Sequence, residues 1–206
     1  EVSDQTSPDM TARLLKEFGL PEQALYRVNG PVNLVRLMQL PDWVERPDLK
    51  FAPFAPGRPD ALVKQPDIFK AIQKGDVLLH HPYQSFSPVL EFIKKAATDP
   101  DVVAIKQTIY RTGTESVLME SLLAAARSGK EVTVVLELMA RFDEEANINW
   151  AAKLERVGAH VVYGVVGQKT HAKMLMVVRR EKTETGKVVL RRYVHLGTGN
   201  YHPKTA

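Results

Sequence analysis

A histidine and a lysine two positions apart, His171 and Lys173, are the side chains of this sequence best suited to chemistry. A neutral imidazole nitrogen is a nucleophile that can attack phosphorus, and an ammonium group offsets the charge on non-bridging phosphate oxygens. In an extended segment the side chains alternate between two faces, so we expect both residues to point the same way. The pair therefore favours phosphoryl transfer, with the histidine as covalent carrier.

Two arginines should reach the same place. Arg111 closes one predicted strand, and Arg141 follows the end of the next strand, about one strand–helix repeat later. Consecutive repeats place both guanidinium groups at the carboxyl edge of the sheet, where open α/β sheets bind ligands. We expect both arginines to hold phosphate there. Surface ion pairs with the acidic residues at 143–145 are the alternative.

A glycine-rich loop supplies the remaining polar groups. The residues Gly197-Thr198-Gly199-Asn200 follow the last predicted strand and should emerge beside His171. Glycines let backbone N–H groups approach an anion closely, and the Asn200 side chain can donate a further hydrogen bond. Asn200 and Lys173 therefore join the two arginines as predicted phosphate-binding residues.

The pattern from about residue 75 onward predicts an α/β fold with a largely parallel sheet. The expected strands are 77–80, 102–110, 131–138 and 160–165. The expected helices are 87–97, with Ser87 as its N-cap, about 115–127, and a third that carries the apolar positions of 148–154 and ends near Gly158. Residues 174–178 and 188–195 are separated only by a short polar run, so they should form an antiparallel hairpin. The predicted sheet is therefore mixed and flanked by helices.

The first third of the chain follows another pattern. Helical spacing of apolar residues at 10–18 and 32–40 is followed by six prolines between Pro41 and Pro66, which exclude a long helix or central strand there. We interpret residues 1–57 as a short, mainly helical segment with a proline-rich connector, and residues 58–206 as a separate domain.

The amino-acid composition limits the classes of protein and of site that are possible. The 206 residues are 44% hydrophobic and 25% charged, which is ordinary for a globular domain. Cysteine is absent, which excludes disulfides, a thiolate nucleophile and cysteine-based metal sites. A formal charge of +4 suits an anionic partner. No apolar run approaches the roughly 18 residues of a membrane span and no signal peptide is evident, so we expect a cytoplasmic protein.

Five segments together resemble a known family. They are YQSF at 83–86, AIKQTIYR at 104–111, ELMARFDE at 137–144, HAKM at 171–174 and HLGTGNY at 195–201. In these motifs residues 75–206 resemble bacterial polyphosphate kinases of the first type. Residues 58–206 resemble the first of that family's two phospholipase D-like C-terminal domains, incomplete at its C-terminus, and residues 1–57 resemble the end of its head domain.

The resemblance implies reversible transfer of the terminal phosphate of ATP to inorganic polyphosphate through a phosphohistidine at His171. It implies Mg²⁺ as cofactor and ATP or ADP as substrate, with Arg111 and Arg141 matching the family's two magnesium-associated arginines. Because a guanidinium group offers no lone pair, we expect both to hold phosphate oxygens that the magnesium also contacts. The residues that bind the nucleotide base are expected outside this stretch.

The resemblance also implies partners and a location. The partners are polyphosphate, ATP, the remaining domains of a parent enzyme and further copies of the full-length chain, with no nucleic acid. The location is the cytoplasm, with a peripheral position at the inner membrane left open. The chain by itself is expected to be inactive or nearly so.

Two other functions remain as alternatives. A phospholipase D-like phosphodiesterase would have the same His-x-Lys motif, but Val178 stands where that pattern has aspartate, and only one such motif is present. A non-catalytic polyanion-binding module has little support, because aromatic residues are 7% of the chain and no stacking pair is flanked by Arg and Lys. His80–His81 and the basic run at 179–182 are not assigned to the site.

Overall fold

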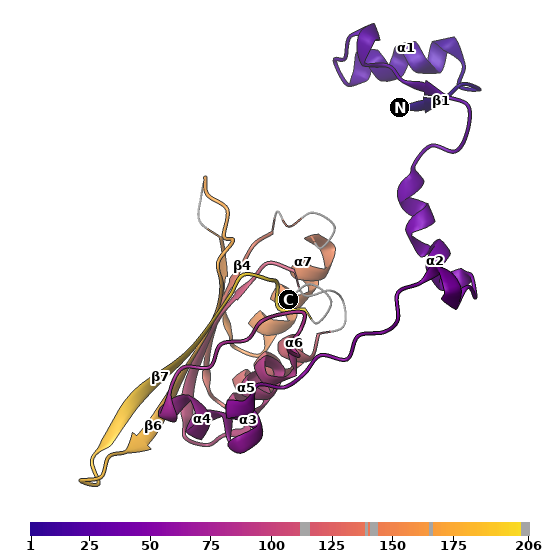
Figure 1. The fold of residues 1–206 in the computed structure, drawn as a ribbon. Helices are drawn as coiled ribbons and strands as arrows, with labels where there is room; N and C mark the ends of the chain where they lie inside the picture. The colour runs from indigo at the N-terminus through magenta and orange to yellow at the C-terminus, as the bar shows by residue number, and fades with distance from the viewer. Residues whose placement is uncertain (112–115, 139, 141–143, 165–166, 203–206) are drawn as a thin grey trace. The chain divides into compact units, whose positions relative to one another are not determined.

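The computed structural model describes residues 1–206 except 112–115, 139, 141–143, 165–166 and 203–206 (Figure 1). The chain divides into two compact units, Glu1–Phe54 and Ala55–Ala206. Every described residue of the predicted site belongs to the second unit.

The first unit consists of short elements. Strands β1 (Val2–Ser3) and β2 (Arg27–Val28) pair in parallel, with helix α1 (Pro8–Glu17) between them in the sequence. Three 3-10 helices and one short α-helix complete it: η1 (Glu22–Ala24), η2 (Leu34–Gln39), α2 (Leu40–Trp43) and η3 (Pro47–Leu49). The predicted helix at 10–18 is confirmed. The second predicted helical segment, at 32–40, forms the 3-10 helix η2 and runs on into α2. Pro41 does not end it, because it lies in the first turn of α2, where its missing N–H costs no hydrogen bond.

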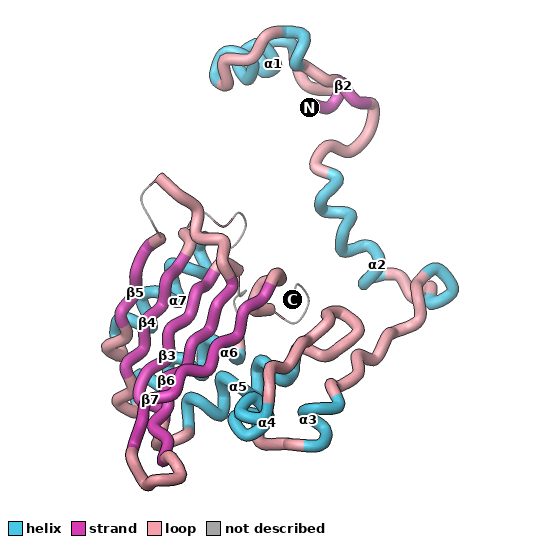
Figure 2. The backbone as a smooth tube through the Cα atoms, turned by 60° about the vertical axis from the view of Figure 1, so that its left-hand side comes forward, coloured by secondary structure: helices cyan, strands magenta, loops and turns pink. Residues whose placement is uncertain are grey.

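The second unit is built on a five-stranded sheet in the order β5-β4-β3-β6-β7 (Figure 2). Its strands are β3 (Val102–Ile109), β4 (Glu131–Leu136), β5 (His160–Tyr163), β6 (Lys173–Lys182) and β7 (Val188–Gly197). Strands β3, β4 and β5 are parallel, and the β6–β7 hairpin adds to β3 in the antiparallel sense. The predicted α/β class, with a mixed sheet flanked by helices, is confirmed.

Helices cover one face of this sheet (Figures 1 and 2). They are α5 (Ser87–Thr98), α6 (Val117–Arg127) and α7 (Glu144–Arg156), preceded by the shorter α3 (Asp60–Lys64) and α4 (Ile68–Lys74). None of the helices in the described ranges is long and apolar enough to cross a membrane. The expected cap of α5 is wrong by one residue, because Phe86 occupies the N-cap position and Ser87 N–H donates to Ser85 Oγ at 3.0 Å.

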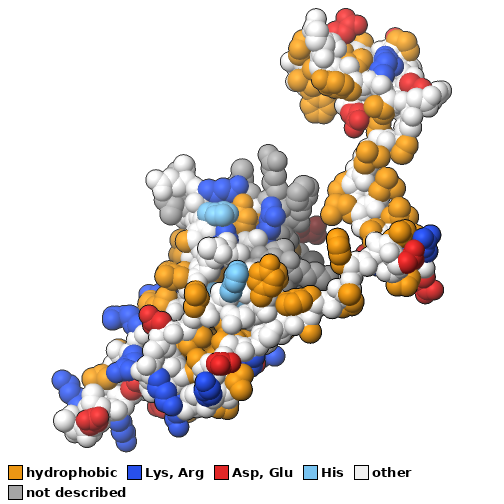
Figure 3. All heavy atoms as spheres, viewed as in Figure 1, with side chains coloured by type: hydrophobic (Ala, Val, Ile, Leu, Met, Phe, Trp, Pro, Cys, Tyr) orange, Lys and Arg blue, Asp and Glu red, His pale blue; other side chains and the backbone are white. Residues whose placement is uncertain are grey.

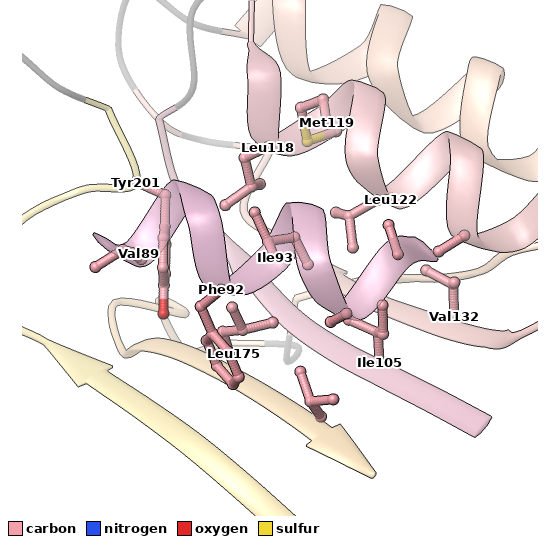
Figure 4. Packing of buried hydrophobic residues seen from close by; sticks show 14 of the residues in the cluster. Val89, Phe92, Ile93, Ile105, Leu118, Met119, Leu122, Val132, Leu175 and Tyr201 are labelled. Atoms are coloured by element: carbon pink, nitrogen blue, oxygen red, sulfur yellow. The ribbon is translucent and has the colours of Figure 1, made fainter. Parts of the chain in front are cut away.

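The hydrophobic core lies between these helices and the sheet. Ile93 of α5, Ile105 of β3 and Leu122 of α6 are fully buried, and Figure 4 shows α5 packed over the strands. Phe92 of α5 also meets Phe69 of α4 edge to face, with ring centroids 5.6 Å apart. Burying one side chain of this size contributes about 2 kcal/mol. This packing fixes the position of the sheet edge at which the polar residues gather.

Several strand predictions need correction, and those at 102–110 and 131–138 end slightly earlier, at Ile109 and Leu136. Residues 77–80 form no strand, and the His80 N–H donates to the Gln84 side-chain oxygen at 2.8 Å instead of to a neighbouring strand. The strand expected at 160–165 ends at Tyr163. The hairpin strands run further than expected, because Arg179 of β6 is held by an ion pair to Asp99 at 3.0 Å and the cross-strand register continues to the turn.

Candidate active site

The ends of all five strands meet at one edge of the sheet. In the parallel part, Ile109 of β3 pairs with Leu136 of β4, and Leu136 pairs with Tyr163 of β5. Strand β6 begins and β7 ends at the same edge, where Lys173 pairs with Gly197. The strand–helix order of the sequence predicts this convergence, and the register confirms it.

The ring of Tyr110, the first residue after β3, is surrounded by cationic and imidazole groups. The His171 ring packs against it with centroids 5.0 Å apart and planes at 77°. Lys173 Nζ lies 4.8 Å from the Tyr110 ring centroid, and Arg111 Cζ and Lys169 Nζ each lie 5.6 Å from it. We call these five residues the Tyr110 cluster. The structure thus brings together three predicted site residues, together with a lysine that sequence reasoning missed.

His171 lies two residues before β6 rather than inside it, and its side chain is exposed. Within the described part of the chain, neither of its ring nitrogens takes part in a hydrogen bond. An accessible imidazole whose nitrogen lone pair is not committed to a neighbour can act as a nucleophile.

Lys173 differs from His171 in being buried, with 6% of its surface exposed. This burial lowers the pKa of its ammonium group, the neighbouring Tyr110 opposes that change, and the charge of Arg111 adds to it. Across the hairpin, a Cβ on Gly197 would lie 3.8 Å from Lys173 Cβ and 3.2 Å from the Cε1 atom of His195. A glycine at 197 therefore lets the loop after β7 pass close to the lysine.

Hydrogen bonds from β3 and from the residue that follows β4 hold the segment that carries His171. Thr108 Oγ1 accepts from Met174 N–H at 2.8 Å and donates to the Ala172 carbonyl oxygen at 2.6 Å. The buried Glu137 accepts from Thr170 N–H at 2.7 Å. These bonds fix alternate backbone positions, so that the side chains between them turn toward the aromatic ring.

Asn147 of α7 joins the ends of two strands. It is fully buried, and its side-chain nitrogen donates to the carbonyl oxygens of Tyr110 and Glu137, at 3.0 Å each. Sequence reasoning missed Asn147, because a single asparagine in a helical pattern gives no sign of which strands it will meet. The bridge ties the backbone of Tyr110 to the neighbouring strand.

Two predicted phosphate-binding residues are not placed around Tyr110 by any described contact. Arg141 lies outside the described residues. Asn200 lies in the loop after β7, and its buried Oδ1 has no hydrogen-bond partner in the part of the chain that the structure describes. Phosphate binding by these two residues therefore stays a prediction.

His195, near the end of β7, forms a hydrogen bond with a tyrosine of the loop that follows. Its Nδ1 lies 2.9 Å from the Tyr201 hydroxyl. Burial, with a further contribution from His81, lowers the pKa of His195 to about 4, so its ring is neutral at pH 7. A cavity of about 430 Å³ beside it is lined partly by His80, His81 and the glycine-rich loop.

A second group of basic side chains covers the far part of the β6–β7 hairpin (Figure 3). Its members on the two strands and their turn are Arg179, Arg180, Lys182, Lys187, Arg191 and Arg192. At about 3.3 Å per residue, the far end of β6 lies roughly 30 Å from Lys173. These charges are therefore separate from the Tyr110 cluster.

The described residues of the site do not fit a directly bound magnesium ion. Magnesium prefers oxygen ligands, whereas Arg111, Lys169 and Lys173 carry nitrogen donors without a lone pair. The described residues contain no group of three histidine, aspartate or glutamate side chains that could hold a metal. Cations of this kind suit the oxygens of a phosphate instead.

Fold and site together define an α/β protein with a cationic, histidine-bearing site at one edge of its sheet. The chain belongs to the family described as polyphosphate kinase C-terminal domain 1, whose sequence pattern matches residues 67–206. The resemblance found in the motifs is thereby confirmed.

Named relatives agree with this assignment. The chain is 67% identical to a polyphosphate kinase of Burkholderia ambifaria and 66% identical to one of Burkholderia lata, over all 206 residues. It spans 30% of the length of each. The crystal structure of polyphosphate kinase from Porphyromonas gingivalis matches 95% of this chain and 29% of that one, with a TM-score of 0.70 and 29% identity. These relatives are named as kinases, which are transferases.

Proposed function

We propose that this chain carries the phosphoryl-transfer site of a polyphosphate kinase, in which His171 takes the terminal phosphate of ATP and passes it reversibly to inorganic polyphosphate. The observation that carries the proposal is the Tyr110 cluster, where an exposed imidazole and three cationic groups contact one ring. In this proposal residues 1–57 are the end of a head domain, and other domains bind the nucleotide base.

The transfer takes place in two balanced steps. A lone pair of the His171 ring forms a bond to the γ-phosphorus, while the bond from that phosphorus to the β–γ bridging oxygen breaks and ADP leaves with the electron pair. A terminal oxygen of polyphosphate then attacks the same phosphorus. The phosphorus–nitrogen bond breaks, the ring recovers its lone pair, and the polymer is one phosphate longer. The reverse sequence makes ATP from ADP.

The cationic groups act on the phosphate oxygens. Lys173 and Arg111 offset the negative charge that gathers on these oxygens as the bonds rearrange. We assign Arg141 and Asn200 the same role from their places in the sequence. Magnesium would be held by the phosphate oxygens themselves, because the described cluster offers it no ligand.

The test needs a complete enzyme, because the chain spans 30% of its relatives. We would replace the aligned 206 residues of the Burkholderia ambifaria kinase by this chain. The hybrid is incubated with γ-labelled ATP and magnesium, and the label is mapped by mass spectrometry. We expect an acid-labile phosphate on His171 that is discharged when polyphosphate is added.

Two variants of the hybrid complete the test. His171→Gln should abolish both the label and polyphosphate synthesis, whereas His160→Gln, an exposed histidine on β5, should change neither. A label on another residue, or synthesis by His171→Gln, would overturn the proposal.

Hydrolysis of a simple phosphodiester by the hybrid would indicate a phospholipase D-like enzyme instead. Salt-dependent polyphosphate binding without any label, unchanged in His171→Ala, would indicate a polyanion-binding module.

The proposal also includes a cytoplasmic location and an assembly of several full-length copies with the remaining domains. These follow from the family and not from a contact in the described residues.

A further inference from the structure

The side chains around Tyr110 come from two places in the sequence. Arg111 is the next residue along the chain, whereas Lys169, His171 and Lys173 alternate along the segment that leads into β6. Alternate residues of an extended segment lie on one side, which explains how all three reach the same ring. One aromatic side chain is therefore the common neighbour of every group in the cluster.

Three positive groups so close together should repel one another and turn away toward water. The face of an aromatic ring attracts cations within about 6 Å of its centroid, and this attraction offsets part of the repulsion. All three of the measured distances to the Tyr110 centroid, 4.8, 5.6 and 5.6 Å, fall inside that range. The ring can thus gather cations before an anion arrives.

The backbone that carries the ring is itself held by the fold. The Tyr110 carbonyl oxygen accepts from the fully buried Asn147 side chain at 3.0 Å, at the end of β3. The imidazole that packs on the ring, by contrast, lies outside any strand and has no hydrogen bond with a described residue. The ring contact is therefore the described interaction that orients the His171 side chain.

We infer that Tyr110 is the positioning residue of this site, because its ring sets where the His171 imidazole stands relative to Lys173, Lys169 and Arg111. The inference rests on the proposed function in giving His171 the phosphoryl group. Tyr110 acts through its ring and takes no part in the bonds that form and break. Consequently a phenylalanine at position 110 should still position the His171 imidazole, whereas a side chain without a ring should not.

The first measurement is independent of catalysis. In the full chain, the ring-proton shifts of His171 are recorded by NMR for the unmodified protein, Tyr110→Phe and Tyr110→Leu. We expect the phenylalanine variant to keep the ring-current displacement and the leucine variant to lose it. Tyr110→Met provides a second ringless variant if Tyr110→Leu does not fold. Unchanged His171 shifts in a folded ringless variant would overturn the inference.

The second measurement uses phosphoramidate, which phosphorylates histidine directly: its phosphorus–nitrogen bond breaks, a new bond to imidazole forms and ammonia leaves. The rate at His171 is measured against His160 in the same molecule. Tyr110→Leu should slow labelling of His171 by about 100-fold, the loss expected for a misplacement of about 1 Å. Tyr110→Phe should stay within about twofold, and the control Tyr163→Leu, an exposed tyrosine on β5, should leave the rate unchanged.

The two readouts separate failure of the inference from failure of the proposed function. Labelling of His171 at the rate of His160 in the unmodified chain would count against His171 as the phosphate carrier, while the NMR comparison still decides whether Tyr110 positions it. Fast labelling of His171 in both the unmodified chain and Tyr110→Leu would leave the carrier in place and reject Tyr110 as its positioning residue.

Discussion

The side-chain nitrogen of Asn147 donates to the carbonyl oxygen of Tyr110 at 3.0 Å, from the buried face of α7 to the end of β3. The same nitrogen bonds to the Glu137 carbonyl oxygen, also at 3.0 Å. One amide nitrogen therefore bonds to two backbone carbonyl groups at once. Tyr110 and Arg111 of the cluster follow the first of these strand ends, that of β3.

Replacing this amide by a carboxylate should therefore be costly. Asn147→Asp keeps the size of the side chain but replaces the donating nitrogen by an oxygen, which faces the carbonyl oxygens of Tyr110 and Glu137 and cannot donate to them. Unsatisfied buried polar groups cost about 1–3 kcal/mol each and a buried unpaired charge costs more, so we expect a loss of at least about 3 kcal/mol. Chemical denaturation measures it. Asn149→Asp, an exposed change on the same helix, should cost less than about 0.5 kcal/mol. Equal losses would contradict this account.

The Thr108 hydroxyl should stabilise the backbone on both sides of Lys173, in the segment that also carries His171. Thr108→Val removes the hydroxyl that serves the Ala172 carbonyl and the Met174 amide and keeps the side chain's shape. We expect a loss of about 1–3 kcal/mol in unfolding free energy and faster amide exchange at Met174. The matched change Thr133→Val, at a hydroxyl on β4 with no hydrogen bond among the described residues, should leave that exchange rate unchanged.

His195 should make the protein less stable in mild acid. Its folded-state pKa of about 4 lies below the ordinary histidine value of about 6.5, so the unfolded chain binds more protons between these two pH values. Stability from this group is fully present above about pH 6.5 and is lost as pH falls toward 4. Between pH 7 and pH 5 the loss is about 2 kcal/mol.

The measurement is the unfolding free energy at pH 7 and pH 5. His195→Gln, which cannot titrate, should lose about 2 kcal/mol less over this interval than the unmodified protein. His160→Gln, at an exposed position, serves as the control and should retain the full pH dependence. A His195→Gln profile parallel to that of the unmodified protein would contradict the assignment.

Arg179 should stabilise the junction between the hairpin and the start of β3. Its guanidinium contacts Asp99 at 3.0 Å and Asp101 at 3.4 Å, and Arg179 Cζ lies 5.2 Å from the Phe69 ring centroid. A lysine cannot reproduce this planar arrangement, so Arg179→Lys should cost about 1–3 kcal/mol. Arg180→Lys, at an exposed neighbouring position, should be nearly neutral in the same denaturation experiment.

The periodicity of the sequence predicts the main elements of the second unit. Alternating β-branched and helical segments give β3, α6, β4, α7 and β5, and the short polar run after β6 gives the hairpin. The failure at 77–80 has a physical reason. Val77 and Leu79 are half-buried because they pack against the core, which produces an alternating pattern without a neighbouring strand.

Only some residues of the site can be predicted from the sequence. Strand order and period two indicate that His171, Lys173 and Arg111 gather at one edge. Tyr110 and Thr108 are not predictable in this way, because their contacts join residues some sixty positions apart and depend on the register between β3 and β6. Such contacts arise from tertiary packing, which no local pattern encodes.

The long hairpin has a practical consequence. Its turn is closed by Thr183 N–H donating to the Lys187 carbonyl oxygen at 2.9 Å, with Glu184 exposed at its tip. Because the chain has no cysteine, a thiol introduced at position 184 would be unique. A spin label or fluorophore attached there would stand roughly 30 Å along the strands from Lys173, as a spectroscopic reporter that leaves the imidazole and its neighbours untouched.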